Sequence, residues 1–166
     1  MFVNIEKSSD KSENYEILLS NLEYYVIKGD KLITNLSNLS AFLDYFLDDI
    51  NWVGFYLYDG EKLFLGPFQG LPACTSIKLG NGVCGTSAKM RQSIVVDDVH
   101  QFENHIGCDS SSNSEIVIPI IKNNELIGVL DIDSPSFSRF DNTDKLYLEK
   151  VISKLVDKLS WVLYNN

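Results

Sequence analysis

The apolar positions of this chain change their spacing twice, and that change limits its architecture more than any single motif does. Over residues 13–50, apolar side chains recur roughly every three or four positions, which predicts two amphipathic helices. A stretch of aromatic and β-branched residues starts at Asn51, and helical spacing returns after Asp141. Helices, then a run of strands, then a helix predict an α+β fold with a central, mostly antiparallel sheet and helices on one face.

Two turn signals divide the strand region. Asp59–Gly60 separates NWVGFYLY from EKLFLGPF, and Asn123–Asn124 separates EIVIPII from ELIGVLDID. Such pairs accept the left-handed backbone of a tight hairpin turn, so we expect two β-hairpins. Between them, the pattern predicts a short helix over 83–92, a strand over 93–99 and a polar loop over 100–114.

Length and charge limit the possible classes of protein. A chain of 166 residues is long enough for one domain with its own core, so we expect a single domain over 1–166. Residues 1–12 are polar and expected to be loosely ordered, 13–50 form the N-terminal helices, and 51–166 hold the sheet, the active-site loops and the last helix.

The net charge of −9 argues against a nucleic-acid or anionic-membrane surface. Because neither a signal peptide nor a membrane-spanning run is evident, we expect a cytoplasmic protein.

Three cysteines, Cys74, Cys84 and Cys108, allow several interpretations. A free cysteine is most often a core residue. A closed disulfide framework cannot use an odd number of thiols, which makes a transient disulfide the more natural alternative. A zinc site with His100 or His105 would need long, unequal spacings and lacks a Cys-x-x-Cys pair. All three thiols lie in turn-rich or polar surroundings, which favours chemistry over simple packing.

Cys84 lies near the predicted start of the short helix, within GNGVCG. A helix N-terminus stabilises negative charge, so this position would lower the pKa of the thiol. The neighbouring glycines, Gly80 and Gly82, would let the backbone approach a ligand closely.

Carboxylates and aromatic residues form a second group of candidates. Asp131 and Asp133 are two apart in a predicted strand and therefore point to the same face, and Glu115 begins another strand. They are either a solvated strand end or a site for a cation. Trp52 and Tyr56 share one face of the first strand, as core residues or as the wall of a binding pocket.

Four blocks carry a resemblance to a known family: LGPFQGLPAC, GNGVCGTSA, DDVHQFENHIGCDSSSNSEIVIPI and IGVLDIDSPSFSRFD. They resemble the signature blocks of the free methionine-(R)-sulfoxide reductases, which are GAF-domain enzymes. The resemblance runs from about Asn51 to the last helix and includes all three cysteines. It implies a GAF fold with a pocket beneath the long loop.

The resemblance also implies an activity and its partners. The expected reaction is reduction of free L-methionine-(R)-S-oxide, with thioredoxin as electron donor and with neither a bound cofactor nor a metal. The family resemblance implies Cys108 as the nucleophile, Cys74 as the first resolving thiol and Cys84 as the second. In this interpretation the two resolving roles are interchangeable, and Cys84 as the attacking thiol also stays open. A homodimer through the helices is compatible with the GAF fold.

The same resemblance assigns the remaining site residues. Glu115, Asp131 and Asp133 would bind the substrate ammonium, and one of them would protonate the sulfoxide oxygen. Trp52 and Tyr56 would wall the pocket. Backbone N–H groups from Gly82 to Cys84 would hold the substrate carboxylate or sulfoxide oxygen.

Two functions of another class remain open at this point. GAF domains also serve as small-molecule sensors without catalysis, and the chain would then use the same pocket only for binding. A redox sensor, in which disulfide formation changes a partner surface, is the third interpretation. The cysteines favour the enzyme, because a pure sensor does not need them.

Overall fold

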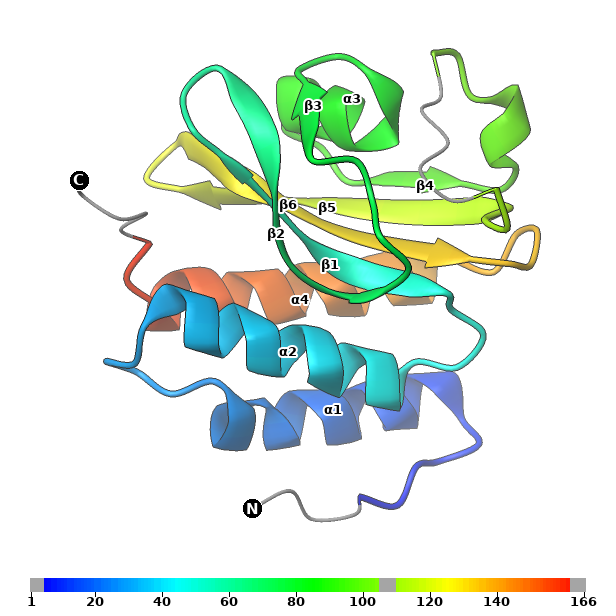
Figure 1. Ribbon diagram of the computed structural model, residues 1–166. Helices are drawn as coiled ribbons and strands as arrows, with labels where there is room; N and C mark the ends of the chain where they lie inside the picture. Colours follow the sequence, from blue (N-terminus) through cyan, green and yellow to red (C-terminus); the bar gives the residue numbers. More distant parts are fainter. Residues whose placement is uncertain (1–4, 105–109, 162–166) are drawn as a thin grey trace.

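A computed structural model describes residues 5–104 and 110–161 of the protein, and in this part of the chain the strands form one six-stranded sheet (Figure 1). The helices are α1 (Lys11–Tyr25), α2 (Leu32–Phe46), α3 (Gly82–Met90) and α4 (Asn142–Lys158), with a short 3₁₀ turn at Val99–Gln101. The strands are β1 (Trp52–Tyr58), β2 (Lys62–Gly70), β3 (Ser76–Lys78), β4 (Ile94–Val96), β5 (Ser114–Lys122) and β6 (Glu125–Ser134).

The sheet has the strand order β3-β2-β1-β6-β5-β4, and each neighbouring pair is antiparallel. Both predicted hairpins are confirmed. Asn123 and Asn124 have φ of 50° and 63°, the left-handed values that a tight turn between β5 and β6 requires. In the other hairpin, the Asp59 carboxylate accepts from the backbone N–H groups of Glu61 and Lys62, which fixes the turn between β1 and β2.

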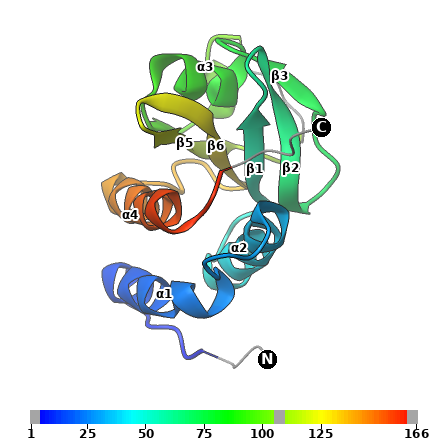
Figure 2. The same ribbon diagram turned by 90° about the vertical axis from the view of Figure 1, so that its left-hand side faces the viewer.

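One face of the sheet is covered by helices in two layers (Figures 1 and 2). Helices α2 and α4 lie against the sheet, and α1 packs on both of them from outside. The main hydrophobic core lies here, where the apolar stripes of the helices meet the inward side chains of the central strands. Its fully buried members include Leu18, Leu36, Leu43, Phe55, Ile118, Leu130, Leu148 and Leu155.

Helix α3 lies on the opposite face of the sheet (Figure 1). Val83, Cys84 and Ala88 of this helix belong to a second, smaller core with Trp52 and Tyr56. The predicted α+β layout is therefore right, and the expectation that all helices share one face is wrong for α3. Amphipathicity alone cannot say which face of a sheet a helix covers, because both faces of this sheet are apolar at its centre.

Helix α1 begins at Lys11, inside the stretch that composition predicts to be loose. Asp10 caps it by accepting from the backbone N–H of Glu13, which satisfies one of the free donors at a helix start. Just before it, Lys7 pairs with Asp48 at 2.9 Å.

Strand β3 falls in a segment without a clear strand pattern, and its three residues were not predicted.

A buried carboxylate joins α1 to α4. Asp144 is fully buried, accepts from the Tyr15 hydroxyl at 2.8 Å, and forms ion pairs with Lys11 and Arg139. The backbone N–H of Arg139 in turn donates to the Ser114 hydroxyl at 3.3 Å. The network therefore reaches from the outer helix layer to the first residue of β5.

Among the described residues, no helix combines the length and the apolar character needed to cross a bilayer.

Candidate functional site

Strand register brings the predicted carboxylates together on the α3 face of the sheet. Glu115 of β5 lies directly opposite Asp133 of β6, and Asp131 is two residues away on the same face. On the other side of β6, Asp133 lies opposite Trp52 of β1. The predicted common orientation of Asp131 and Asp133 is confirmed, and the antiparallel pairing adds Glu115 and Trp52 to the same patch.

The aromatic residues stack beside this patch. The ring centroid of Trp52 lies 5.9 Å from that of Tyr56 and 5.3 Å from that of Phe68, at small interplanar angles. Gly54 makes this possible, because a Cβ there would lie 2.7 Å from the Trp52 ring and 2.4 Å from the Phe68 Cβ. Trp52 and Tyr56 are 3% and 1% exposed, so they are core residues that also form a wall of the pocket.

Polar ends of the two aromatic residues hold the segment that follows β2. The Trp52 indole N–H donates to the Leu71 carbonyl at 3.1 Å, and the Tyr56 hydroxyl donates to the Cys74 carbonyl at 3.0 Å. Burial and the nearby Asp131 charge raise the pKa of Tyr56, which keeps the hydroxyl protonated as a donor. The aromatic wall and the segment carrying Cys74 are therefore linked directly.

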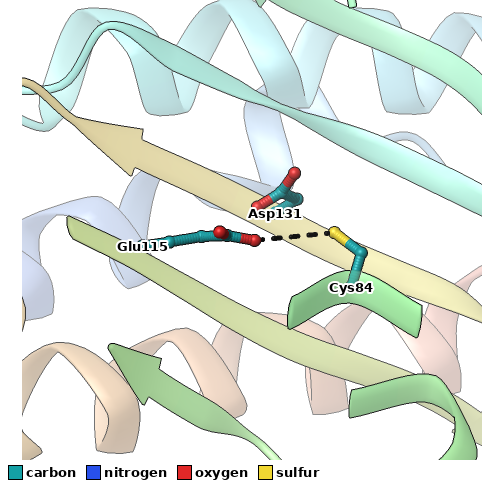
Figure 3. A group of neighbouring side chains, drawn as sticks. All are labelled: Cys84, Glu115 and Asp131. Atoms are coloured by element: carbon teal, nitrogen blue, oxygen red, sulfur yellow. Dashed lines mark hydrogen bonds between the residues drawn. The ribbon is translucent and has the colours of Figure 1, made fainter. Parts of the chain in front are cut away.

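Helix α3 presents Cys84 to the carboxylates from above the sheet. Figure 3 shows the side chains of Cys84, Glu115 and Asp131 pointing toward one another. The Cys84 Sγ lies 3.9 Å from the Glu115 Oε1. Gly85 permits this placement, because a Cβ there would lie 2.3 Å from the Lys78 carbonyl oxygen. In the GNGVCG motif, glycine therefore allows a close approach between helix α3 and the backbone at Lys78.

The surroundings raise the pKa of the Glu115 and Asp131 carboxyls and of the Cys84 thiol. Burial, followed by the Asp131 charge, raises the pKa of Glu115, and burial raises the pKa of Asp131 to about 6. Burial, followed by the charges of Asp131 and Glu115, also raises the pKa of the Cys84 thiol well above its usual value. The expectation that the helix N-terminus lowers this pKa is therefore wrong, because desolvation and two carboxylates outweigh the helix dipole.

Among the described residues, no ion pair is formed by Glu115 or Asp131. Glu115 and Asp131 are each 6% exposed, and the ion pairs of the described residues involve other carboxylates. The Asp131 Oδ1 is buried without a hydrogen-bond partner in the part of the chain that the structure describes. A buried, unpartnered carboxylate oxygen costs free energy, so this arrangement indicates a site built for a cationic ligand.

A cavity of about 40 Å³ opens between these groups. It is lined by Trp52, Tyr56, Leu71, Pro72, Ala73, Ile77, Asn81, Gly82, Val83, Cys84, Ser112, Glu115, Asp131 and Asp133. All five predicted substrate-binding residues are among them. Ser112 also lines the cavity and was not among the predicted site residues; it is 4% exposed and accepts from the Asn51 side-chain amide at 3.0 Å. Its only sequence signal was its place inside the SSSNSEIV block.

One expected backbone contact is not available in the structure. The N–H of Gly82 donates to the Asn104 carbonyl at 3.0 Å, so it does not face a ligand. The first turn of α3 is therefore tied to Asn104, within the long loop.

The described cysteines differ in state. Cys84 is a buried free thiol, whereas Cys74 is disulfide-bonded and half-buried, next to the cavity-lining Ala73. The predicted nucleophile Cys108 and the candidate ligand His105 lie outside the described residues. His100 contacts the Asn113 side chain at 3.0 Å and is exposed. Among described residues, the group able to hold a metal ion is instead Cys84, Glu115 and Asp131.

Comparison with known proteins agrees with this geometry. The GAF domain family model matches residues 39–155, which spans the whole sheet and α3. The free methionine-R-sulfoxide reductase of Escherichia coli is 43% identical over 155 residues, covering 93% of this chain and 94% of the relative.

Solved structures give the same result. The free methionine-R-sulfoxide reductase of Neisseria meningitidis, in complex with its substrate, superposes with a TM-score of 0.90 at 40% identity, covering 95% of this chain and 95% of that one. A putative GAF sensor protein of Burkholderia vietnamiensis superposes with a TM-score of 0.88 at 46% identity, covering 91% and 96%. The predicted GAF fold is confirmed.

Proposed function

Because the chain belongs to the free methionine-R-sulfoxide reductase family of GAF-domain proteins, an oxidoreductase family, we propose that it reduces free L-methionine-(R)-S-oxide to L-methionine. One observation carries the proposal: a buried acidic patch faces a cavity walled by Trp52 and Tyr56, and its Asp131 Oδ1 has no hydrogen-bond partner among the described residues. A free amino acid supplies an ammonium for the acids and an apolar side chain for the rings.

The acidic patch explains selection for the free amino acid. The ammonium would be held by Glu115, Asp131 and Asp133, which the strand register gathers on one face. A methionine sulfoxide inside a polypeptide has an amide in place of the ammonium. It would leave buried carboxylates without a partner, at a cost on the order of several kcal/mol.

The chemical step follows from the polarity of the sulfoxide. The Cys108 thiolate would attack the partly positive sulfur while a proton passes to the oxygen, giving methionine and a cysteine sulfenic acid. Glu115 is suited to deliver that proton, because burial and the Asp131 charge raise its pKa and so favour its protonated form. A second thiol would then condense with the sulfenic acid, releasing water and forming a disulfide.

The states of the two described cysteines support the order of the resolving steps. Cys74 is disulfide-bonded beside the cavity, which suits the first resolving thiol. The Cys84 thiol is free and has a raised pKa, so it is a weak nucleophile until its surroundings change. It fits a later exchange, from which thioredoxin would restore the dithiol in a reducing cytoplasm.

The test is a coupled assay with thioredoxin, thioredoxin reductase and NADPH. Free methionine-(R)-sulfoxide should drive NADPH oxidation, and N-acetyl-methionine sulfoxide, which lacks the ammonium, should not. Cys108→Ser should form no methionine in a single turnover, whereas Cys74→Ser should form the first equivalent and then cycle slowly.

The likeness to a putative GAF sensor keeps binding without turnover as the second candidate. Saturable binding of methionine sulfoxide, with NADPH consumption no higher than in the protein-free control, would favour the sensor. Normal cycling by Cys108→Ser would instead remove that residue as the nucleophile.

A further inference from the structure

The ligand atoms of Cys84, Glu115 and Asp131 lie within 4.8 Å of one another, although they come from α3, β5 and β6 (Figure 3). A tetrahedral zinc ion with a bound thiolate and carboxylate sets their sulfur and oxygen about 3.5 Å apart. The observed distance from the Cys84 Sγ to the Glu115 Oε1 is 3.9 Å. A side-chain movement on the order of 1 Å would therefore bring all three atoms to an ion.

Two further features of the cluster point to an ion. The Asp131 Oδ1 is buried and unpartnered among the described residues, so one donor atom is already free for a ligand. The adjoining cavity of about 40 Å³ has room for an ion with a water or two, since about 10–15 Å³ of such volume holds one water. A methionine sulfoxide would have to widen it, whereas an ion would not.

We propose that Cys84, Glu115 and Asp131 bind one divalent transition-metal ion of the zinc class, and that this ion excludes an amino acid from the pocket. The donor set selects the metal, because a thiolate favours zinc or cobalt over magnesium and calcium, which prefer oxygen donors only. Three protein ligands leave a fourth position for water. Binding releases to the buffer the Cys84 proton and the proton of either carboxyl that carries one, and it transfers no electron.

The site differs from the zinc site considered from sequence, which needed the other cysteines and a histidine. Only one thiol enters it, and two carboxylates complete it. Metal binding at these three residues does not depend on the reaction proposed above. The competition between the metal ion and an amino acid rests on the proposed function.

The first test is a Co²⁺ titration of the full chain carrying Cys74→Ser and Cys108→Ser, so that Cys84 is the only thiol. One equivalent of Co²⁺ should give near-ultraviolet thiolate-to-cobalt absorption, and Zn²⁺ should displace it. Adding Cys84→Ser to this protein should abolish the band. Cys84→Ala serves as a second variant, with circular dichroism to verify folding.

Carboxylate variants test the rest of the ligand set by calorimetry with Zn²⁺. Glu115→Gln and Asp131→Asn should each weaken binding by about tenfold or more, since even outer-shell partners of a metal commonly contribute 10–100-fold. Glu125→Gln, at the exposed far end of β6, is the matched control and should leave the affinity unchanged. His100→Ala should also leave it unchanged.

Absence of the cobalt band, its persistence after Cys84→Ser, or unchanged affinity in both carboxylate variants would overturn the proposal. With wild-type protein, Zn²⁺ should raise the apparent KM for methionine sulfoxide more than it lowers kcat. If the protein never reduces the sulfoxide, the proposed reaction is refuted. The cobalt titration still tests the metal site independently.

Discussion

Replacing Asp131 by asparagine should stabilise the fold at neutral pH and have little effect near pH 4. Burial raises the pKa of this carboxyl from 3.8 to about 6 in the folded protein. The folded state therefore holds the proton more tightly than the unfolded chain does. As pH rises from about 4 to about 6, the unfolded chain ionises first and stability falls. Above about pH 6 the full penalty is present, and asparagine removes it.

The size of the effect follows from the shift. A difference of about two pKa units corresponds to roughly 3 kcal/mol, at about 1.4 kcal/mol per unit. For a chain of this length, that is a rise of about 6–12 °C in Tm. The Asp131 charge also raises the pKa of Glu115, so removing it relieves a second penalty of the same sign.

The assay is urea unfolding of both proteins at pH 4 and at pH 7.5, with the m-values compared to verify two-state behaviour. Glu125→Gln is the matched control: it lies on the same strand but is exposed, so it should leave stability nearly unchanged at both pH values. A variant that is less stable than wild type at pH 7.5, or an equal difference at both pH values, would refute the reasoning.

Two other substitutions test how the site is held together. Tyr56→Phe keeps the aromatic wall but removes the hydrogen bond to the Cys74 carbonyl, so we expect a nearly normal first turnover and several-fold slower thioredoxin-driven cycling, measured by comparing single-turnover and steady-state rates. Equal slowing of both phases would mean that the hydroxyl acts elsewhere. Gly85→Ala places a Cβ against the Lys78 carbonyl and should cost about 1–3 kcal/mol in urea unfolding, with a loss of activity because Cys84 moves with α3. Wild-type stability in that variant would show that α3 has more freedom than the contact implies.

Stability and function conflict at the acidic patch. Glu115 and Asp131 are desolvated and close to a thiol, and each would be more stable as a neutral group. Groups with perturbed pKa values of this kind cluster at functional sites, where a ligand can compensate for their burial. The ammonium of an amino acid and a divalent metal ion both meet that requirement, which is why one patch supports two separate proposals.

Local patterns were sufficient for part of this protein. Asp131 and Asp133 had to share a face because side chains alternate along a strand, and the Asn123–Asn124 pair determined a hairpin through its tolerance of left-handed backbone. The cysteine-bearing blocks were enough to identify the family. Each of these signals depends on residues that are neighbours in sequence.

Only the tertiary structure decided which distant residues meet. The pairing of Glu115 with Asp133 depends on strand register, and the position of Cys84 above them depends on which face of the sheet α3 covers. That placement reversed the expected direction of the thiol pKa, because desolvation and like charges come from other elements, whereas the helix dipole is local. Sequence spacing carries information on local geometry, but burial and electrostatics sum over every element packed around a group.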